Sequence, residues 1–321
     1  MAVYTDITEG ELREFLSAYE LGGVLSYRGI AEGVENSNFI VHLEEGEFIL
    51  TLYEKRVNEQ ELPFFIGLMD HLAAKGFRCP RPVQRRDGGV IGRLAGRPAA
   101  MVTFLEGVWP REPQPVHCAG VGEALGRMHM AVSDFEGHRT NGLALADWRS
   151  LFEQVGDAAD QVIDGMAAEV RFMLDRLEAE WPDDLPCGVI HADAFPDNVF
   201  FLGNKFSGLI DFYFACNDLF AYDVAIILNA WCFDSDERFD RQKAAALLRS
   251  YQTYRPLTDA EKAALPALCR GAAMRFLLTR LYDWIHTPAG ASVTKKDPRQ
   301  PLAWLRYHNA IDSPEAYGLS S

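Results

Sequence analysis

The spacing of apolar residues changes abruptly near a proline-rich stretch at residues 106–115, and this change constrains the fold more than any other feature. Before the stretch, short apolar runs bounded by turn residues predict strands at 25–30, 38–43, 48–53 and 99–104. The segment 58–75 instead repeats apolar residues at helical spacing. Beyond the stretch, helical spacing dominates over residues 116–134, 148–155, 161–181, 223–233, 239–254 and 258–286.

These segments predict an α+β chain made of two lobes. With 321 residues, the chain is long enough to bury two hydrophobic cores. We expect a small β-sheet N-lobe with one long helix at residues 1–105 and a mostly helical C-lobe at residues 106–321. The proline-rich stretch between them is typical of a hinge.

Local turn and cap signals add detail to this plan. Thr8 and Thr258 each stand three residues before a glutamate, a pattern that predicts a capping box at a helix start. The residues 44–47 predict a hairpin turn between two strands of the N-lobe. Asp87-Gly88-Gly89 predicts a second hairpin, between short strands at 83–84 and 90–91.

A polar segment in the second half lies among the few strands expected there, at 189–190, 199–202 and 209–210. It contains His191, Asp193, Asp197 and Asn198, and Ile210-Asp211-Phe212 follows it. Protein kinases use the spacing His-x-Asp-x-x-x-x-Asn in a loop that transfers a phosphoryl group. One carboxylate accepts a proton from the attacking hydroxyl, while an amide oxygen and a second carboxylate hold Mg²⁺ against the phosphates of ATP. The pattern predicts Asp193 as the base, and Asn198 and Asp211 as the metal ligands.

The polar residues of this segment also have plainer explanations. Asp, Asn and Pro are common turn residues, so an ordinary loop between two strands is the alternative for the whole segment. His191 is expected to hold the loop through a ring nitrogen. Asp223 begins a helix, where it either stabilises the first turn or supports the loop backbone. Asp197 is either a turn residue or a substrate contact, and His129, among apolar helical neighbours, is expected in the core.

Charge and cysteine content argue against several kinds of partner. The net charge of −15 and the lack of a basic stripe argue against nucleic acid. The chain has no apolar run of about 18 residues, and its acidic N-terminal stretch does not resemble a signal peptide, so no membrane partner is expected. Six scattered cysteines without a C-x-x-C pair, most of them among apolar residues, indicate that most are buried thiols in a reducing, cytoplasmic setting.

The chain lacks the common phosphate-binding motifs. The Walker A and G-x-G-x-x-G patterns do not occur in the expected places. The loop 29–39 joins two expected strands and carries small and polar residues, whose backbone N–H groups can cover phosphates. An ordinary hairpin loop is the alternative explanation.

Taken together, these residues resemble the aminoglycoside phosphotransferase and choline kinase-like family over nearly the whole chain. The shared features are the segment 191–198, Ile210-Asp211-Phe212, and the downstream Asp223 in Tyr222-Asp223-Val224-Ala225. Within that family, the stretches 33–39, 48–55, 62–65 and 189–215 are most similar to the type II homoserine kinases. The resemblance implies a bilobal protein-kinase-like fold, and ATP- and Mg²⁺-dependent phosphorylation of the side-chain hydroxyl of L-homoserine in threonine biosynthesis.

The resemblance also assigns nucleotide contacts to the N-lobe. It implies that the phosphates lie against Gly33, Asn36, Ser37 and Asn38, and that adenine lies against the strand that holds Met101 and Phe104. Many family members grip the phosphates with a lysine or arginine in the third strand, where this chain has Thr51. Lys55 or Arg56 is the expected substitute, with Glu59 or Glu61 as its acidic partner.

Two other functions stay open at the level of sequence. One is a kinase for another amino alcohol, such as choline, ethanolamine or an aminoglycoside. The other is a non-catalytic nucleotide-binding pseudokinase, which the threonine at position 51 favours and the intact Asp193, Asn198 and Asp211 disfavour. The sequence predicts neither the residues that recognise the acceptor nor the oligomeric state.

Overall fold

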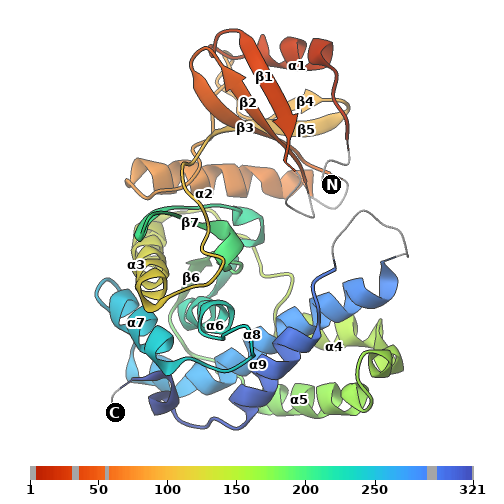
Figure 1. The fold of residues 1–321 in the computed structure, drawn as a ribbon, viewed down its shortest axis with the longest axis vertical. Coiled ribbons are helices and arrows are strands. Elements are labelled where there is room, and N and C mark those ends of the chain that lie inside the picture. The colour runs from red at the N-terminus through yellow and green to blue at the C-terminus, as the bar shows by residue number, and fades with distance from the viewer. Residues whose placement is uncertain (1–4, 31–35, 55–57, 288–294, 320–321) are drawn as a thin grey trace. The chain divides into compact units, whose positions relative to one another are not determined.

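The computed structural model describes residues 5–30, 36–54, 58–287 and 295–319. The chain forms two compact units, of which the first includes residues up to Glu106 and the second begins at Gly107. The sequence placed this boundary after residue 105. Figure 1 labels the elements of both units.

The first unit is built on a five-stranded antiparallel sheet with the strand order β1-β2-β3-β5-β4. A hairpin joins β2 to β3 where the sequence predicted it, with Leu43 opposite Gly46. The capping box predicted at Thr8 and Glu11 is confirmed at the start of the first helix. The elements are α1 (Glu9–Leu16), β1 (Val24–Gly29), β2 (Ser37–Leu43), β3 (Gly46–Leu52), α2 (Leu62–Ala74), β4 (Gly92–Leu94) and β5 (Arg97–Thr103).

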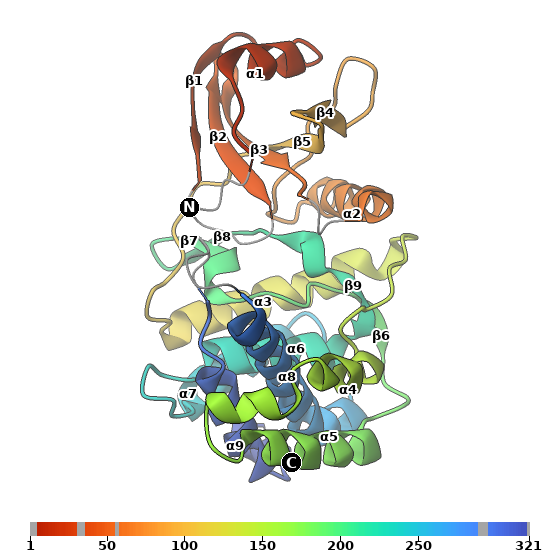
Figure 2. The same ribbon diagram turned by 90° about the vertical axis from the view of Figure 1, so that its right-hand side faces the viewer.

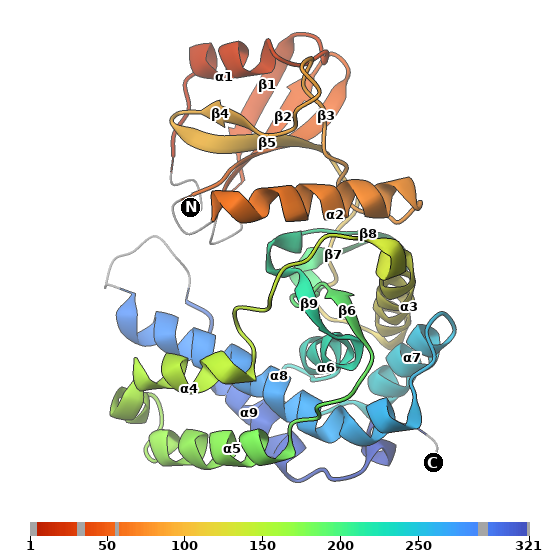
Figure 3. The same ribbon diagram turned by 180° about the vertical axis from the view of Figure 1, so that it is seen from behind.

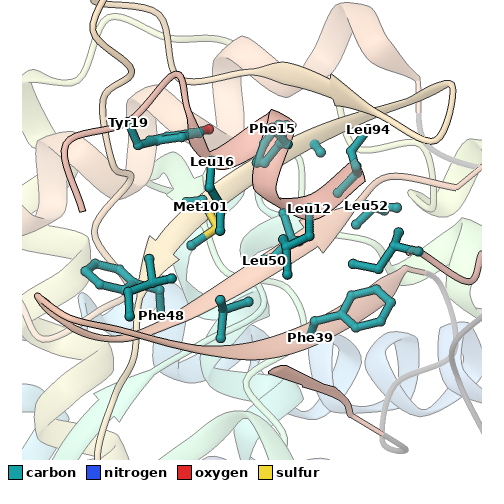
Figure 4. Close-up of a cluster of buried hydrophobic side chains, with 14 residues drawn as sticks. Leu12, Phe15, Leu16, Tyr19, Phe39, Phe48, Leu50, Leu52, Leu94 and Met101 are labelled. Atoms are coloured by element: carbon teal, nitrogen blue, oxygen red, sulfur yellow. The ribbon is translucent and has the colours of Figure 1, made fainter. Parts of the chain in front are cut away.

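The core of the first unit lies between α1 and one face of the sheet. Figure 4 shows Leu12 and Phe15 of α1 packed against Leu50 of β3 and Met101 of β5. Alternate strand residues share a face, so Phe48, Leu50 and Leu52 all point to this side. The second helix, α2, lies on the other side of the sheet (Figures 1 and 3).

The hairpin predicted around Asp87-Gly88-Gly89 is wrong in its strands. The turn itself forms, with the N–H of Arg85 2.7 Å from the carbonyl oxygen of Gly89, but neither flank is a strand. Val83 instead donates its N–H to the carbonyl of Met101, at 2.9 Å. The real hairpin joins β4 to β5 through Ala95-Gly96, with φ values of 50° and 74°. An alanine is uncommon at positive φ, so the sequence carried little sign of this turn.

The second unit is mainly helical. The buried helix α6 (Phe220–Trp231) lies in its middle, near α3 (Pro115–Ala131), α7 (Arg241–Gln252) and α8 (Asp259–His286) (Figures 1 and 3). Three further helices pack on α8, namely α4 (Leu145–Glu153), α5 (Met166–Glu180) and α9 (Arg299–Asn309) (Figure 2). The capping box predicted at Thr258 and Glu261 is confirmed at the start of α8. None of the helices within the described ranges is long and apolar enough to cross a bilayer.

Glycines allow α3 and α7 to approach closely. A Cβ atom on Gly122 would lie 2.2 Å from the carbonyl oxygen of Leu247, and one on Gly126 would lie 2.7 Å from that of Tyr251. Contacts this short are far inside van der Waals distance. The backbones of the two helices therefore pack against each other only because these positions have no side chain.

Two short antiparallel pairs complete the second unit. Strand β6 (Cys187–Ile190) pairs with β9 (Cys216–Leu219), and β7 (Val199–Leu202) pairs with β8 (Lys205–Leu209). The sequence did not predict β9 or α9. Strand β9 was missed because it contains Asn217 and Asp218, which are uncommon in strands. The helix predicted over 161–181 begins later, at Met166, after a short 3₁₀ helix over Gly156–Gln161.

Candidate active site

The loop 191–198 leaves β6 and enters β7, and a buried carboxylate fixes its first turn. Ala192 has a φ of 62°, which turns the chain sharply after β6. Asp223, in the first turn of α6, accepts the N–H of His191 at 2.8 Å and the N–H of Ala192 at 2.9 Å. The Asp223 side chain is completely buried, so these bonds replace water around its charge.

His191 connects the same loop to the end of β8. Its Nε2 lies 3.0 Å from the carbonyl oxygen of Ile210, and its Nδ1 lies 3.2 Å from the backbone nitrogen of Asp193. A carbonyl only accepts and a backbone N–H only donates, so Nε2 carries the ring proton and Nδ1 does not. Burial lowers the pKa of His191 to about 4, which keeps the ring neutral.

The fold brings Asp193, Asn198 and Asp211 together. The Nδ2 of Asn198 donates to the backbone carbonyl of Asp193 at 2.9 Å and to its Oδ2 at 3.2 Å. The N–H of Ile210 donates to the carbonyl of Asn198 at 2.9 Å, so the chain reaches Asp211 one residue later. Asp211 itself has a φ of 64°, a conformation in which aspartate is more common than most residues.

The two carboxylates of this group lie in an environment that disfavours their charged forms. Asp193 is half-buried, and desolvation raises its pKa to about 7; Arg275 opposes this shift and Asp211 adds to it. Asp211 keeps an exposed surface, but protein atoms crowd its carboxylate and raise its pKa to about 6, while the N–H of Tyr213 opposes the shift. A cation bound here would stabilise both charges.

The donor set fits magnesium. Both hydrogen bonds of the Asn198 side chain use Nδ2, so within the described ranges its amide oxygen has no donor. With the carboxylate of Asp211 it offers the hard oxygen ligands that Mg²⁺ prefers. The described residues contain no cluster of three or more His, Cys, Asp or Glu suited to a metal. Magnesium does not need such a cluster, because one or two protein ligands and substrate phosphates usually suffice.

Three further side chains hold the loop, from α6, from α8 and from the segment before α9. Trp231 of α6 donates its ring N–H to the carbonyl of Ala194 at 2.8 Å. Arg275 of α8 donates to the carbonyl of Ala192. Lys296 lies 3.3 Å from the exposed carboxylate of Asp197. An arginine within the apolar stretch of a long helix was a signal that could have identified Arg275.

His129 is a buried residue, and it is also the third partner of Asp223. Its Nε2 lies 3.0 Å from Oδ2 of Asp223, and its Nδ1 lies 2.9 Å from the hydroxyl of Tyr251. Burial lowers the pKa of His129, although the hydrogen bond to Asp223 opposes this shift. The contact between α3 and α6 was not predictable from the sequence, because the two residues are 94 positions apart along the chain.

In the first unit, the side chains expected near the nucleotide already have partners. Thr51 donates its hydroxyl to Oδ1 of Asn38 at 2.8 Å, across the β2–β3 pair. Ser37 donates its hydroxyl to Glu54 at 2.6 Å, and Oδ1 of Asn36 accepts the N–H of Glu54 at 3.3 Å. The Nδ2 groups of Asn36 and Asn38 take no part in these bonds, so they and the backbone groups are what these residues have left for a ligand.

The resemblance also implies nucleotide contacts by glycine, by a basic residue and by the strand that holds Met101 and Phe104. Gly33, Lys55 and Arg56 lie outside the described residues. The carbonyl of Met101 accepts the N–H of Val83, while the N–H of Phe104 donates to Glu47 at 3.3 Å. Glu59, one of the two suggested acidic partners, pairs with Arg93 at 2.8 Å.

Solved structures with the same arrangement of helices and strands identify the class of fold. The structure of amicoumacin kinase matches 95% of this chain and 93% of its own, with a TM-score of 0.73 and 15% identity. That of a microcompartment-associated aminopropanol kinase matches 94% of this chain and 97% of its own, with a TM-score of 0.69 and 18% identity. At such identities the likeness shows the fold alone, and it confirms the predicted α+β protein-kinase-like fold.

Sequence relatives identify the family. The model of the phosphotransferase enzyme family matches residues 26–257, and the chain belongs to this family. A homoserine kinase of Brucella ovis is 60% identical over 319 residues, which are 99% of this chain and 98% of that protein. One of Rhizobium rhizogenes is 59% identical over 321 residues, the full length of both. The predicted resemblance is thus confirmed, and the chain is a small-molecule phosphotransferase.

Proposed function

We propose that the protein transfers the γ-phosphoryl group of ATP to the side-chain hydroxyl of L-homoserine, giving O-phospho-L-homoserine for threonine biosynthesis. The hydrogen-bonded arrangement of Asp193, Asn198 and Asp211 carries the proposal for phosphoryl transfer. Identity of about 60% to homoserine kinases over the whole chain supports homoserine as the acceptor.

Asp193 is the proposed base. Its backbone N–H is held by His191, and its carboxylate by Asn198, so the side chain has a fixed position in which to orient the acceptor hydroxyl. It accepts the hydroxyl proton as the oxygen attacks phosphorus. A general base placed in this way typically contributes about 10²–10⁴ in rate. Because the chemistry depends on position and charge, no covalent intermediate with the protein is needed.

Asn198 and Asp211 are the proposed magnesium ligands, through the amide oxygen and the carboxylate. When bound, the ion neutralises charge on the ATP phosphates. The hydrogen bonds of Asn198 to Asp193 keep its amide oxygen turned away from the base, and the Ile210–Asn198 bond keeps the two ligands adjacent.

We assign nucleotide binding to the first unit and acceptor binding to the second. The nucleotide contacts proposed by resemblance are Gly33, Asn36, Ser37, Asn38, Met101, Phe104 and Lys55. Because the hydroxyl of Ser37 and the Oδ1 atoms of Asn36 and Asn38 are already engaged, we expect the Nδ2 groups of the two asparagines and the backbone groups of 36–38 to make the contacts. Asp197 is exposed on the loop and is the proposed partner of the substrate ammonium group.

A panel of acceptors tests the proposal. ADP release is measured with ATP·Mg²⁺ and L-homoserine, choline, ethanolamine or an aminoglycoside, and the product is identified by ³¹P NMR. We expect kcat/KM for L-homoserine to exceed that for each other acceptor by at least about a hundredfold. A preference for another amino alcohol would replace the proposed substrate, and no ADP release with any acceptor would contradict catalysis.

A further inference from the structure

Arg280 has an unusual combination of burial and unused hydrogen-bond donors. Its side chain, on α8, is only 8% exposed. Its Nη1 lies 3.1 Å from the carbonyl oxygen of Asp297 and 2.8 Å from Oε1 of Gln300. Within the described ranges, Nε and Nη2 have no hydrogen-bond partner. Neither nitrogen is among the side-chain atoms that are sealed from solvent without a partner, so both donors stay within reach of a ligand.

A row of aromatic side chains connects Arg280 to the loop 191–198. Its guanidinium lies 5.6 Å from the ring centroid of Trp304, and that ring is 6.3 Å from the ring of Phe195. Phe195 also packs against Phe276 of α8, with ring centroids 4.6 Å apart. Phe195 follows the proposed base by two residues, so Arg280 lies on the side of the loop formed by α8 and α9.

The charge of Arg280 also acts on the loop. Burial lowers its pKa to about 10, and the carboxylates of Asp193, Asp197 and Asp297 oppose that shift. The group is thus a cation at neutral pH, within electrostatic range of the proposed base.

The substrate chemistry requires such a cation. L-Homoserine carries its hydroxyl at one end of a four-carbon chain, and an ammonium group and a carboxylate at the other. When the hydroxyl meets Asp193, the carboxylate must lie within the length of that short chain. Without a positive partner, its charge would be placed among Asp193, Asp197 and Asp211 and would be repelled.

Three described cations lie beside the loop, and two of them are already committed. Arg275 donates to the carbonyl of Ala192 and lies over the rings of Phe214 and Phe276. Lys296 is more than half exposed and pairs with Asp197. Arg275 is buried as well, and its Nε has no hydrogen-bond partner in the described part of the chain, but that atom is closed off from solvent. The unused Nε and Nη2 of Arg280 are not among the closed-off atoms, so a ligand can reach them.

We propose that Arg280 binds the α-carboxylate of L-homoserine through Nε and Nη2 and thereby selects an amino acid over a simple amino alcohol. The proposal rests on the proposed function. Two parallel N–H donors on one guanidinium match the two oxygens of a carboxylate, and this geometry distinguishes arginine from lysine. An acceptor without the carboxylate leaves the buried guanidinium unpaired and is rejected for that reason.

The test compares two acceptors that differ only in the carboxylate. These are L-homoserine and 3-aminopropan-1-ol, which is homoserine without its carboxyl group. For the wild type we expect kcat/KM for homoserine to exceed that for aminopropanol by about a hundredfold or more. A hydrogen bond between buried charged groups is expected to contribute a factor of this size. Arg280→Gln should lose about a hundredfold on homoserine and change little on aminopropanol. The ratio of the two values, measured on one preparation, does not depend on the folded fraction.

Two further variants provide a second test and a control. Arg280→Lys keeps the charge but not the paired donors, so it should lose about tenfold on homoserine alone. If Arg280→Gln does not fold, the comparison of the two acceptors is made with Arg280→Lys instead. Arg306→Gln removes a half-exposed arginine of α9 that pairs with Glu169, and it should leave both values unchanged.

The outcomes separate the two proposals. If the wild type does not phosphorylate homoserine, the proposed function fails and the assignment of Arg280 fails with it. If the wild type does so, but Arg280→Gln slows both acceptors equally, Arg280 acts on the phosphoryl group or on the fold, and only its assignment is overturned. The same holds if Lys296→Gln, and not Arg280→Gln, causes the loss that is specific to homoserine.

Discussion

Asp223 should be essential for the shape of the loop 191–198, and the structure allows the cost of replacing it to be worked out. Its Oδ2 accepts the N–H of His191 at 2.8 Å and contacts Nε2 of His129 at 3.0 Å, while its Oδ1 accepts the N–H of Ala192 at 2.9 Å. The substitution Asp223→Asn keeps the size of the side chain but replaces one acceptor oxygen with an NH₂ donor. That donor must then face a backbone N–H or the ring of His129.

The magnitude follows from the groups left unpaired. With the amide oxygen in the Oδ2 position, the N–H of Ala192 loses its acceptor and the new NH₂ gains none. Each unpaired buried polar group costs about 1–3 kcal/mol, so we expect the free energy of unfolding to fall by about 2–6 kcal/mol. This is a large part of a typical stability of about 5–15 kcal/mol. Because the turn at Ala192 precedes Asp193 directly, we also expect kcat to fall by about 10² in the folded fraction.

Urea unfolding, followed by circular dichroism, measures the stability, and ADP release with homoserine measures kcat. The matched control is Asp175→Asn on α5, where the carboxylate is 71% exposed and pairs with Arg149. It should change the stability by no more than about 0.5 kcal/mol. An Asp223→Asn variant as stable and as active as this control would refute the reasoning.

Three other predictions concern packing, acid stability and the metal. Gly122→Ala would place a Cβ 2.2 Å from the carbonyl oxygen of Leu247, so the free energy of unfolding measured in urea should fall by about 1–3 kcal/mol. The control Gly142→Ala, with nothing within 4 Å of its Cβ, should leave that free energy unchanged. Equal effects of the two substitutions would contradict the close α3–α7 packing. His308 is buried between Asn229 and Tyr317, and burial lowers its pKa to about 3. Since an unfolded histidine has a pKa of about 6.5, its neutral form stabilises the fold fully above that pH, and stability is lost at up to about 1.4 kcal/mol per pH unit as the pH falls from 6.5 toward 3. His308→Gln should flatten the dependence of unfolding free energy on pH between about 6.5 and 4, and an unchanged slope would exclude this origin. Asp211→Asn should raise the Mg²⁺ concentration for half-maximal activity about tenfold or more, and an unchanged requirement would exclude its role as a ligand.

Features encoded by neighbouring residues were predictable from the sequence. The capping boxes at Thr8 and Thr258 need only residues one helical turn apart, and both are present. The proximity of Asn198 to Asp211 depends on one short hairpin, β7–β8. The first strand was expected with its observed bounds, while the second was expected at 209–210 and in fact runs over Lys205–Leu209. Local periodicity and turn chemistry were sufficient in these cases.

Features that depend on distant segments were not predictable. His129 meets Asp223 only because α3 packs beside α6, and Arg280 approaches Phe195 only because α8 and α9 fold back beside the loop. Strand β9 is short and contains Asn217 and Asp218, which have low strand propensity. Its extended conformation therefore depends on its pairing with β6, a distant segment. The proposed acceptor side of the site belongs to this group, because α8 and α9 follow the motif by many residues.

The most direct test of the account compares the wild type with Asp193→Asn at saturating ATP·Mg²⁺ and L-homoserine. Formation of O-phospho-L-homoserine is followed by ³¹P NMR, and binding of ATP·Mg²⁺ by calorimetry on the same samples. If Asp193 is the base, the wild type forms the product, while the variant binds nucleotide normally but turns over about 10²–10⁴ times more slowly. A variant with near wild-type kcat, or a wild type that forms no phosphohomoserine, would contradict the central claim.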